Sequence, residues 1–306
     1  MKRPARLAAP ALAALALTAL LLAACSKKAG PEEINGTFAL AGGTPKATAT
    51  LYAAPAGSPP QDSGQGVPMT LGISMTKTGA KTPIQHYDTE LTKELHLIAV
   101  GSGLRSFVHV HGDAPDKDGR FQVPVRFPHS GFYWVFADAT PAGLGQQVFR
   151  FDLRVGTAKG ASAPAAAPPL PPPSLDAADG DYAVHLDPFT LTAGQETTLH
   201  MHILHDGQPA LDVAPYLGVT AHAVLISASD LSYTHVHAQA PGTPGAGMGG
   251  GMDSMSGMGS APPLTGRVPP DLALHVEPPT PGTYRLWLQF MAGGQVRTVA
   301  FTVLIQ

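Results

Sequence analysis

Cysteine is nearly absent from this chain. Cys25 is the only cysteine among the 306 residues, and it ends an apolar N-terminal segment. Once Cys25 is set aside, a folded domain made from the rest of the chain has no disulfide, no thiolate metal site and no cysteine nucleophile. Any metal chemistry therefore has to use histidine, methionine or carboxylate ligands.

Charged residues are also sparse. They make up 13% of the chain, the net charge is −3, and the only basic run lies at the N-terminus. The sequence thus lacks the basic patch of a nucleic-acid-binding protein. The 34 glycines and 31 prolines favour many short strands and turns over long helices.

The N-terminal residues have the pattern of an export signal. A basic start is followed by an apolar run over residues 7–22 and by small residues before Cys25. The stretch Leu-Ala-Ala-Cys that ends at Cys25 resembles the lipobox of bacterial lipoproteins. This resemblance implies a signal peptide over residues 1–24, cleavage before Cys25 and lipidation of its sulfur and amine. The alternative is an ordinary secretory signal with an incidental cysteine.

A lipid anchor predicts a place in the cell envelope. Acyl chains contribute roughly 0.8 kcal/mol per buried methylene, so more than one chain holds a protein stably at a membrane. Ser26, rather than aspartate, follows Cys25, which favours the outer membrane, facing the periplasm, in a Gram-negative host. Residues 25–36 are predicted to be the lipidated cysteine and a flexible tether.

The first domain, residues 37–156, shows alternating patterns typical of short strands. They cover residues 37–40, 47–52, 69–75, 95–100, 107–111, 121–127, 132–137 and 148–155. This pattern predicts an all-β immunoglobulin-like sandwich. Residues 157–180, rich in alanine and proline, are predicted to be a semi-rigid linker.

The second domain, residues 181–306, repeats the first. Residues 70–111 align without a gap on residues 196–237 at a constant offset of 126. The first-copy residues that are identical in the second are Met75, Pro83, Leu91, His96, Ser106, His109, Val110 and His111. Tyr133 and Tyr284 each enter a late strand after a glycine, as in the tyrosine corner of immunoglobulin-like sandwiches. Two tandem β-sandwich domains are therefore expected.

Each copy contains a hairpin with three histidines. They are His96, His109 and His111 in the first copy and His222, His235 and His237 in the second. Residues i and i+2 of a strand share a face, and the third histidine lies across the hairpin. Three imidazoles on one face can bind Zn(II) or Cu(II) and leave a position open. The alternative is a set of structural histidines that hydrogen-bond to the backbone or to one another.

The second copy carries further candidate ligands. His200 and His202 flank Met201 on a preceding segment and are predicted to join the trio if their strand neighbours it. Met201, which matches Met75, is predicted to lie in the core. A Gly/Ser-rich loop over residues 242–263 contains four methionines whose thioethers suit Cu(I), or which reflect only biased composition: Met248, Met252, Met255 and Met258. The second copy is therefore the one expected to bind metal, and the first is expected to be mainly scaffold.

The HVH motifs with their upstream histidines and late Gly-x-Tyr resemble those of uncharacterised bacterial exported lipoproteins with tandem β-sandwich domains. In these proteins a proline usually follows the motif, where this chain has Gly112 and Ala238. The architecture is more loosely similar to YtkA-like and CopC-like modules, although the N-terminal histidine ligand of CopC-like proteins is missing.

Together these features predict a membrane-anchored, non-enzymatic protein of the cell envelope. It would bind copper, or else zinc, for capture, buffering or delivery to a copper-handling envelope protein. Two alternatives stay open: an interaction or scaffolding module with structural histidines, and a three-histidine metalloenzyme, for which no general acid or base is evident.

Overall fold

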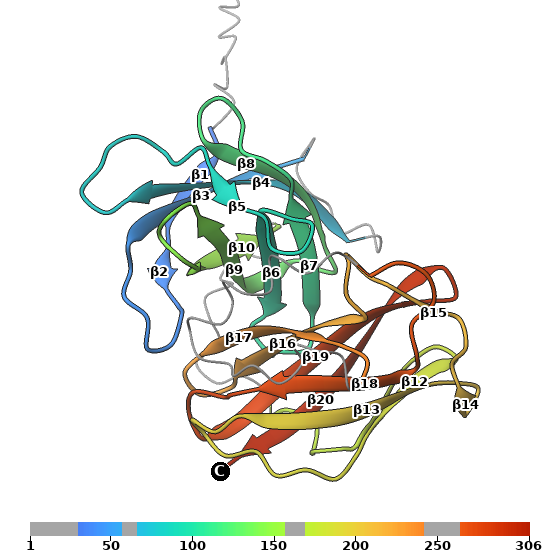
Figure 1. Cartoon of the computed structure of the whole chain (residues 1–306). Helices are drawn as coiled ribbons and strands as arrows, with labels where there is room; N and C mark the ends of the chain where they lie inside the picture. The colour runs from blue at the N-terminus through green and yellow to red at the C-terminus, as the bar shows by residue number, and fades with distance from the viewer. Residues whose placement is uncertain (1–29, 57–65, 157–168, 242–263) are drawn as a thin grey trace, which may run out of the picture. The chain divides into compact units, whose positions relative to one another are not determined.

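Alternating burial along short segments gives this chain its strands. The computed structural model describes residues 30–56, 66–156, 169–241 and 264–306, and within these ranges every element is a strand (Figure 1). No helix in the described ranges is long and apolar enough to cross a membrane. Cys25, the signal peptide and the methionine loop lie outside the described residues.

The first domain is a sandwich of two antiparallel sheets. Its outer sheet has the order β1 (Glu32–Asn35), β3 (Ala47–Pro55), β4 (Val67–Lys77), β8 (Arg120–Phe127). Its inner sheet has the order β2 (Thr37–Phe38), β10 (Gln147–Val155), β9 (Gly131–Pro141), β6 (Leu95–Gly101), β7 (Phe107–Gly112), with β5 (Tyr87–Asp88) paired to β9. Side chains of both sheets fill one core.

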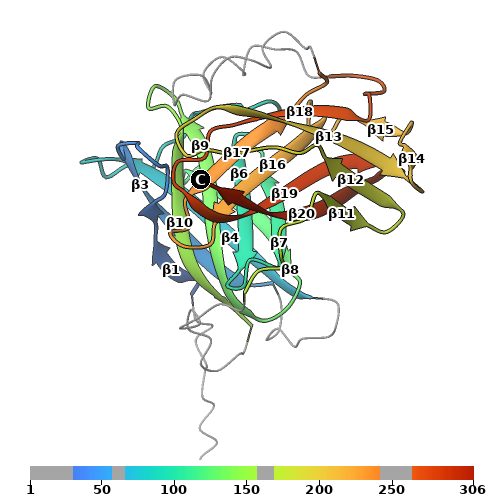
Figure 2. The same cartoon turned by 90° about the horizontal axis from the view of Figure 1, so that it is seen from below.

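The second domain repeats this sandwich. Its outer sheet contains β11 (Asp176–Asp179), β12 (Tyr182–Leu186), β13 (Thr197–His205), β14 (Gln208–Pro209) and β18 (Asp271–Val276). Its inner sheet contains β15 (Val213–Ala214), β19 (Gly282–Ala292), β16 (Ala221–Ser227), β17 (Tyr233–Ala238) and β20 (Gln295–Ile305). Figure 2 shows β16, β17 and β19 side by side. The all-β, tandem-sandwich prediction is confirmed.

The two predicted tyrosine corners are also confirmed. The buried Tyr133 hydroxyl donates a hydrogen bond to the backbone carbonyl of His129, and Tyr284 does the same to Thr280, each over 3.0 Å. Because each bond reaches back four residues, it fixes the chain where β9 or β19 begins. The residues two and four positions after each tyrosine join the same core, as the alternation predicts.

Some predicted boundaries are wrong. Part of the predicted tether forms β1, an edge strand that pairs with β3 and packs Ile34 against the core. The end of the predicted linker forms β11. Leu170 and Leu175 pack against buried clusters, so the prolines around them do not form a free spacer. These short, polar or proline-rich segments carry too weak an alternation to be recognised as packed chain.

A third apolar cluster joins the two inner sheets. Residues 31–306 form one compact unit, and the cluster contains outward-facing side chains of both domains: Ile98, Val100, Leu104, Phe136, Val148, Val224, Ile226, Tyr233 and Trp287. Phe107 stacks on Trp287 with ring centroids 5.0 Å apart, and Tyr233 stacks on Phe136 at the same distance. Tyr233 is the repeat equivalent of Phe107, and Trp287 that of Phe136. The interface thus has an approximate internal two-fold symmetry, as in an isologous dimer.

This cluster predicts a large effect of removing one ring. Trp287→Ala should lower the free energy of unfolding by about 3–5 kcal/mol, because it opens a cavity between two buried faces. The measurement is urea unfolding of the full chain at neutral pH. Leu211→Ala is the control, since Leu211 is 73% exposed. Equal losses in the two variants would contradict a packed interface at Trp287.

Candidate metal centre

The hairpin strands place the six trio histidines on the outward faces of the inner sheets. On β6, Leu95 and Leu97 point into the sandwich core while His96 points away from it. His96 pairs directly with His111 across the β6–β7 hairpin, and His222 pairs with His237 across the β16–β17 hairpin. The predicted convergence of three histidines in each hairpin is confirmed by this register.

The two trios meet at the interface between the domains. The ring centroids of His96 and His235 are 4.9 Å apart, and those of His109 and His222 are 5.6 Å apart. These two contacts are equivalent under the repeat offset. The six imidazoles therefore form a single cluster, which we call the histidine centre.

The histidine centre is withdrawn from solvent. His96 and His222 are 1% exposed and His235 is 3% exposed. His111 is the exception, being only partly buried beside the ion pair of Lys93 and Asp113. The side of His111 is therefore the most open approach to the centre.

A hydrogen bond from the other domain fixes the tautomer of His109. Its Nδ1 lies 2.9 Å from Oε1 of Gln289, and the Gln289 amide nitrogen donates to Thr298. Because Oε1 can only accept, Nδ1 of His109 carries the proton and Nε2 keeps a lone pair. That lone pair faces Nδ1 of His96 at 3.3 Å and Nε2 of His111 at 3.0 Å.

His235 has a similar but longer contact, which exceeds hydrogen-bond distance. Its Nδ1 lies 3.6 Å from a carboxylate oxygen of Asp138, which also accepts a hydrogen bond from Tyr233. Asp138 and Gln289 occupy the same repeat position, opposite His96 and His222 on the neighbouring strands. Each domain thus orients the first histidine of the other domain's HVH motif, as outer groups orient the ligands of metal sites.

His222 is oriented by the backbone of its own domain. Its Nε2 donates to the carbonyl of Tyr216 over 3.1 Å, which leaves a lone pair on Nδ1. That atom faces Nε2 of His235 at 3.4 Å. Because Nδ1 of His222 is an acceptor, this contact is satisfied either by a proton on Nε2 of His235 or by a cation between the two nitrogens.

Glu90 adds a carboxylate that the sequence pattern did not reveal. It is the repeat equivalent of Tyr216, and each precedes a leucine with positive φ: 58° at Leu91 and 52° at Leu217. A non-glycine residue in this region is strained, and strain of this kind is often found at functional sites. The turn holds the Glu90 side chain 4.0 Å from Nε2 of His96 and 3.7 Å from Nε2 of His237.

Several buried polar atoms of the centre have no hydrogen-bond partner among the described residues. They are Oε1 of Glu90, Nε2 of His96, Nδ1 of His235 and both ring nitrogens of His237. A buried polar group without a partner costs roughly 1–3 kcal/mol, and more if it is charged. Such a concentration of unsatisfied donors and acceptors needs a physical explanation, and a bound ion would supply one.

Burial keeps the imidazoles neutral. Desolvation, together with neighbouring imidazoles, lowers the pKa of His109, His111 and His235 to about 3. The pKa values of His96, His222 and His237 also lie well below the usual range, for the same reasons. Neutral imidazole is the form that binds metals, so the folded site needs no proton loss from these rings near neutral pH.

Burial raises the pKa values of the two carboxyl groups of the centre. Burial, with repulsion from Asp138, raises the pKa of Glu90 to about 8. Burial raises the pKa of Asp138 to about 6, although hydrogen bonds from Gln146 and Tyr233 oppose this change. A cation beside them would favour both ionised forms.

Within the part of the chain that the structure describes, three sets of ligand atoms lie close enough to hold a metal ion, with all atoms of a set within 4.8 Å of one another. One set contains His96, His109 and His111, a second contains Glu90, His235 and His237, and a third contains His96, His222 and His235. Histidines of the first copy therefore take part as fully as those of the second.

The other predicted ligands do not reach this centre. His200 and His202 lie on β13 of the outer sheet, so their strand does not neighbour the hairpin. His200 is exposed, and His202 contacts Asp187 and Asp271. Met201 is fully buried in the sandwich core, as predicted. The methionines of loop 242–263 lie outside the described residues.

One serine–histidine contact elsewhere has a structural explanation. Oγ of Ser106 lies 2.6 Å from Nε2 of His129, next to the tyrosine corner. The equivalent residues of the second domain, Ser232 and Thr280, form the same network around Tyr284 without a histidine. The pair therefore belongs to the corner and gives no sign of a nucleophile.

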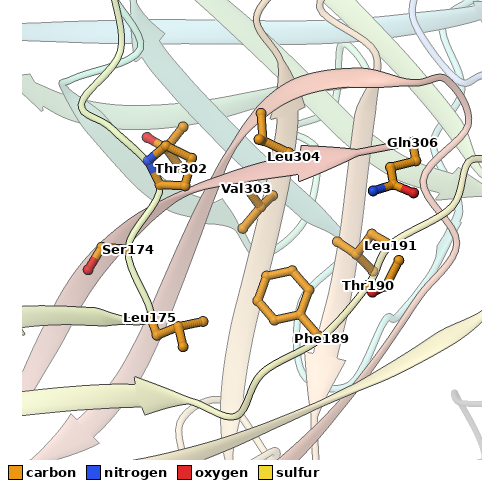
Figure 3. A pocket seen from close by; sticks show the side chains of 10 residues that line it. Ser174, Leu175, Phe189, Thr190, Leu191, Thr302, Val303, Leu304 and Gln306 are labelled. Atoms are coloured by element: carbon orange, nitrogen blue, oxygen red, sulfur yellow. The ribbon is translucent and has the colours of Figure 1, made fainter.

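A surface pocket lies apart from the histidine centre. Figure 3 shows its apolar wall, with Leu175, Phe189 and Leu191 gathered around Val303 of β20. Its lining contains no histidine and no acidic side chain. It offers no ligands for a metal.

Comparisons with solved structures show low similarity. A red sea bream transglutaminase has 13% identity and a TM-score of 0.21, with 86% of this chain and 32% of that chain covered. A mutant α2-macroglobulin of Salmonella has 12% identity and a TM-score of 0.20, with 86% and 15% covered. A chimeric titin Z1Z2 has 12% identity and a TM-score of 0.18, with 91% and 98% covered. The chain thus spans less than a third of the first two proteins. No curated protein matches it.

One family model does match. Residues 58–157 and 176–306 align with a family described as a domain of unknown function, DUF8832. These segments include most of both sandwiches and every ligand candidate of the histidine centre. Because they make up more than half of the sequence, the chain belongs to the DUF8832 family.

Proposed function

We propose that this protein captures metal ions, copper in particular, at the histidine centre. The observation that carries the proposal is the convergence of imidazole lone pairs whose outer nitrogens are directed at Gln289, Asp138 and the Tyr216 carbonyl. The inward nitrogens lie 3.0–3.4 Å from one another, a spacing that suits ligands of a shared ion as well as hydrogen bonds between imidazoles. Outer groups that fix the far nitrogens of ligating histidines are a feature of metal sites, and this supports the proposal.

The donor set indicates which metals suit the centre. Imidazole binds copper and zinc well, whereas the carboxylate-rich sites of Ca²⁺ and Mg²⁺ need many more oxygens. The four methionines of loop 242–263 are expected to favour Cu(I) over zinc, since thioethers are soft ligands. We propose binding rather than catalysis, because the centre is enclosed by its own ligands.

The proposed setting is the cell envelope. Lipidation of Cys25 would fasten the protein to a membrane, on the outer-membrane face toward the periplasm in a Gram-negative host. A tethered chain with a buried copper site suits buffering or delivery to another copper-handling envelope protein. Detection of acylated Cys25 by mass spectrometry of the mature N-terminus would test the anchor.

One prediction of the proposed function distinguishes the histidine centre from the outer-sheet histidines as the place where metal binds. His235→Ala/His237→Ala should weaken copper binding at the set that contains Glu90 by more than about 100-fold, because it removes two of the three ligands of that set. His200→Ala/His202→Ala should leave the affinity unchanged, since both residues lie on the outer sheet. Isothermal titration of the full chain with Cu(I), Cu(II) and Zn(II) provides the measurement, and circular dichroism checks the fold. If the parent protein binds both Cu(I) and Cu(II) only with millimolar or weaker affinity, the proposed function is refuted.

A second prediction concerns the orientation of His235. Asp138→Asn keeps the shape of the side chain but removes its charge, and should lower metal affinity by about 10–100-fold. Asp187→Asn is the matched control, because Asp187 contacts His202 on the outer sheet. An unchanged affinity in Asp138→Asn would show that Asp138 does not support the ion.

A third prediction concerns acid stability in the presence of a chelator. Unfolded imidazoles take up protons near pH 6.5, but in the folded protein His109, His111 and His235 do so only near pH 3. Protons therefore favour the unfolded chain as the pH falls below about 6.5. Each such group should remove about 1.4 kcal/mol of folding free energy per pH unit.

Glu90 has the opposite linkage. Its pKa is raised from 4.5 to about 8, so its contribution is full below pH 4.5 and is lost as the pH rises toward 8. In urea unfolding between pH 5 and 7, the free energy of unfolding should fall steeply as the pH decreases. In His235→Gln/His237→Gln, the slope of this free energy against pH should be smaller by about the contribution of two protons. The same slope in that variant and the parent would contradict neutral, buried imidazoles.

A further inference from the structure

Two of the three ligand sets share no residue. The first contains three imidazoles of domain 1, and the second combines Glu90 with His235 and His237 of domain 2. We propose that the histidine centre holds two copper ions at once, one in each of these sets. This inference rests on the proposed function and specifies its stoichiometry.

The distances in the first set suit one ion. Two ligands that lie 2.0–2.1 Å from a tetrahedral ion are separated by roughly 3.3 Å. Nε2 of His109 lies 3.3 Å from Nδ1 of His96 and 3.0 Å from Nε2 of His111. The Nε2 atom of His109 can accept a proton from only one of the two nitrogens that face it. An ion would use all three lone pairs.

The second set contains most of the unsatisfied atoms. Nε2 of His237 lies 3.7 Å from Oε1 of Glu90, and neither atom has a hydrogen-bond partner among the described residues. Glu90 also faces Nε2 of His96 at 4.0 Å with its other oxygen. The carboxylate therefore lies between the two sets, with one oxygen toward each.

The third set is the rival arrangement, because it would place a single ion between the domains. It would use Nδ1 of His222 and Nε2 of His235, which are 3.4 Å apart, together with His96. A single ion there takes His96 from the first set and His235 from the second. It leaves Oε1 of Glu90 and both nitrogens of His237 without partners. Two ions would give a partner to Oε1 of Glu90 and to one ring nitrogen of His237, as well as to the lone pairs around His109.

Charge indicates the oxidation state. The described ligands and their supporting groups include two buried carboxyls, Glu90 and Asp138, and six neutral imidazoles. Two monovalent ions would balance two carboxylates, whereas two divalent ions would leave an excess of two positive charges in a buried site. Cu(I) should therefore fill both positions, and Zn(II) should fill both only with an added anion such as hydroxide.

The experiment counts ions in a chain whose loop methionines cannot contribute. The full-length protein with M248L, M252L, M255L and M258L is loaded with Cu(I) under anaerobic reductant and examined by native mass spectrometry in detergent. Two copper ions per chain are expected. Adding Glu90→Gln should leave one ion, because the first set is intact, and circular dichroism checks that the variant is folded. His185→Ala, a control on the outer sheet, should leave two.

The outcomes distinguish the two proposals. One ion in both the loop variant and its Glu90→Gln derivative would overturn the two-ion inference and leave the proposed function standing. No ion in the loop variant would overturn both. A third outcome is two bound ions in the Glu90→Gln derivative and one in His109→Ala/His111→Ala. This outcome would exclude the assignment of an ion to the second set.

Discussion

The docking of the two inner sheets is the interaction on which the histidine centre depends. His109 is oriented by Gln289 and His235 by Asp138, so each ligand group needs a side chain from the other domain. The stacked pairs beside them repeat the same exchange, with Phe107 on Trp287 and Tyr233 on Phe136. A separated domain would keep its three imidazoles but lose their orientation. The centre is thus a property of the interface, as a shared site is in a two-fold dimer.

The polarity of this interface has a cost that apolar packing alone would avoid. Burying an imidazole or carboxyl without full hydrogen bonding is unfavourable, and a well-packed apolar replacement often stabilises a protein. Around the histidine centre the apolar cluster already supplies such packing. Apolar docking alone therefore does not account for the six imidazoles and two carboxyls. In the proposed function, a bound ion would compensate for the desolvation of their unsatisfied atoms.

The sequence was sufficient to predict most strands of both sandwiches, the hairpin register and the tyrosine corners, because strand alternation is a local pattern and the repeat is visible in an ungapped alignment. The sequence also contained a pattern that indicates docking of the two inner sheets, although the histidines within it made this pattern hard to recognise. Residues 95–101 and 221–227 are buried on both faces, and Ile98 and Val224 alternate with the core residues instead of polar ones. Glu90, Asp138 and Gln289 could not be assigned to the centre, since their contacts join segments far apart in the chain. For the same reason, the residues of β1 and β11 were predicted to be tether and linker.

The asymmetry of the centre differs from the one that the sequence indicated. The extra histidines of the second copy, His200 and His202, lie on its outer sheet, away from the interface. Both carboxyls come from the first copy, where the second has Tyr216 and Gln289 at the equivalent positions. One domain thus supplies both carboxyl groups, while both domains supply imidazoles. Because Glu90 reaches toward His96 and His237 together, its carboxyl group contacts both sides of the interface. The first domain is therefore an equal partner in the proposed site and not its scaffold.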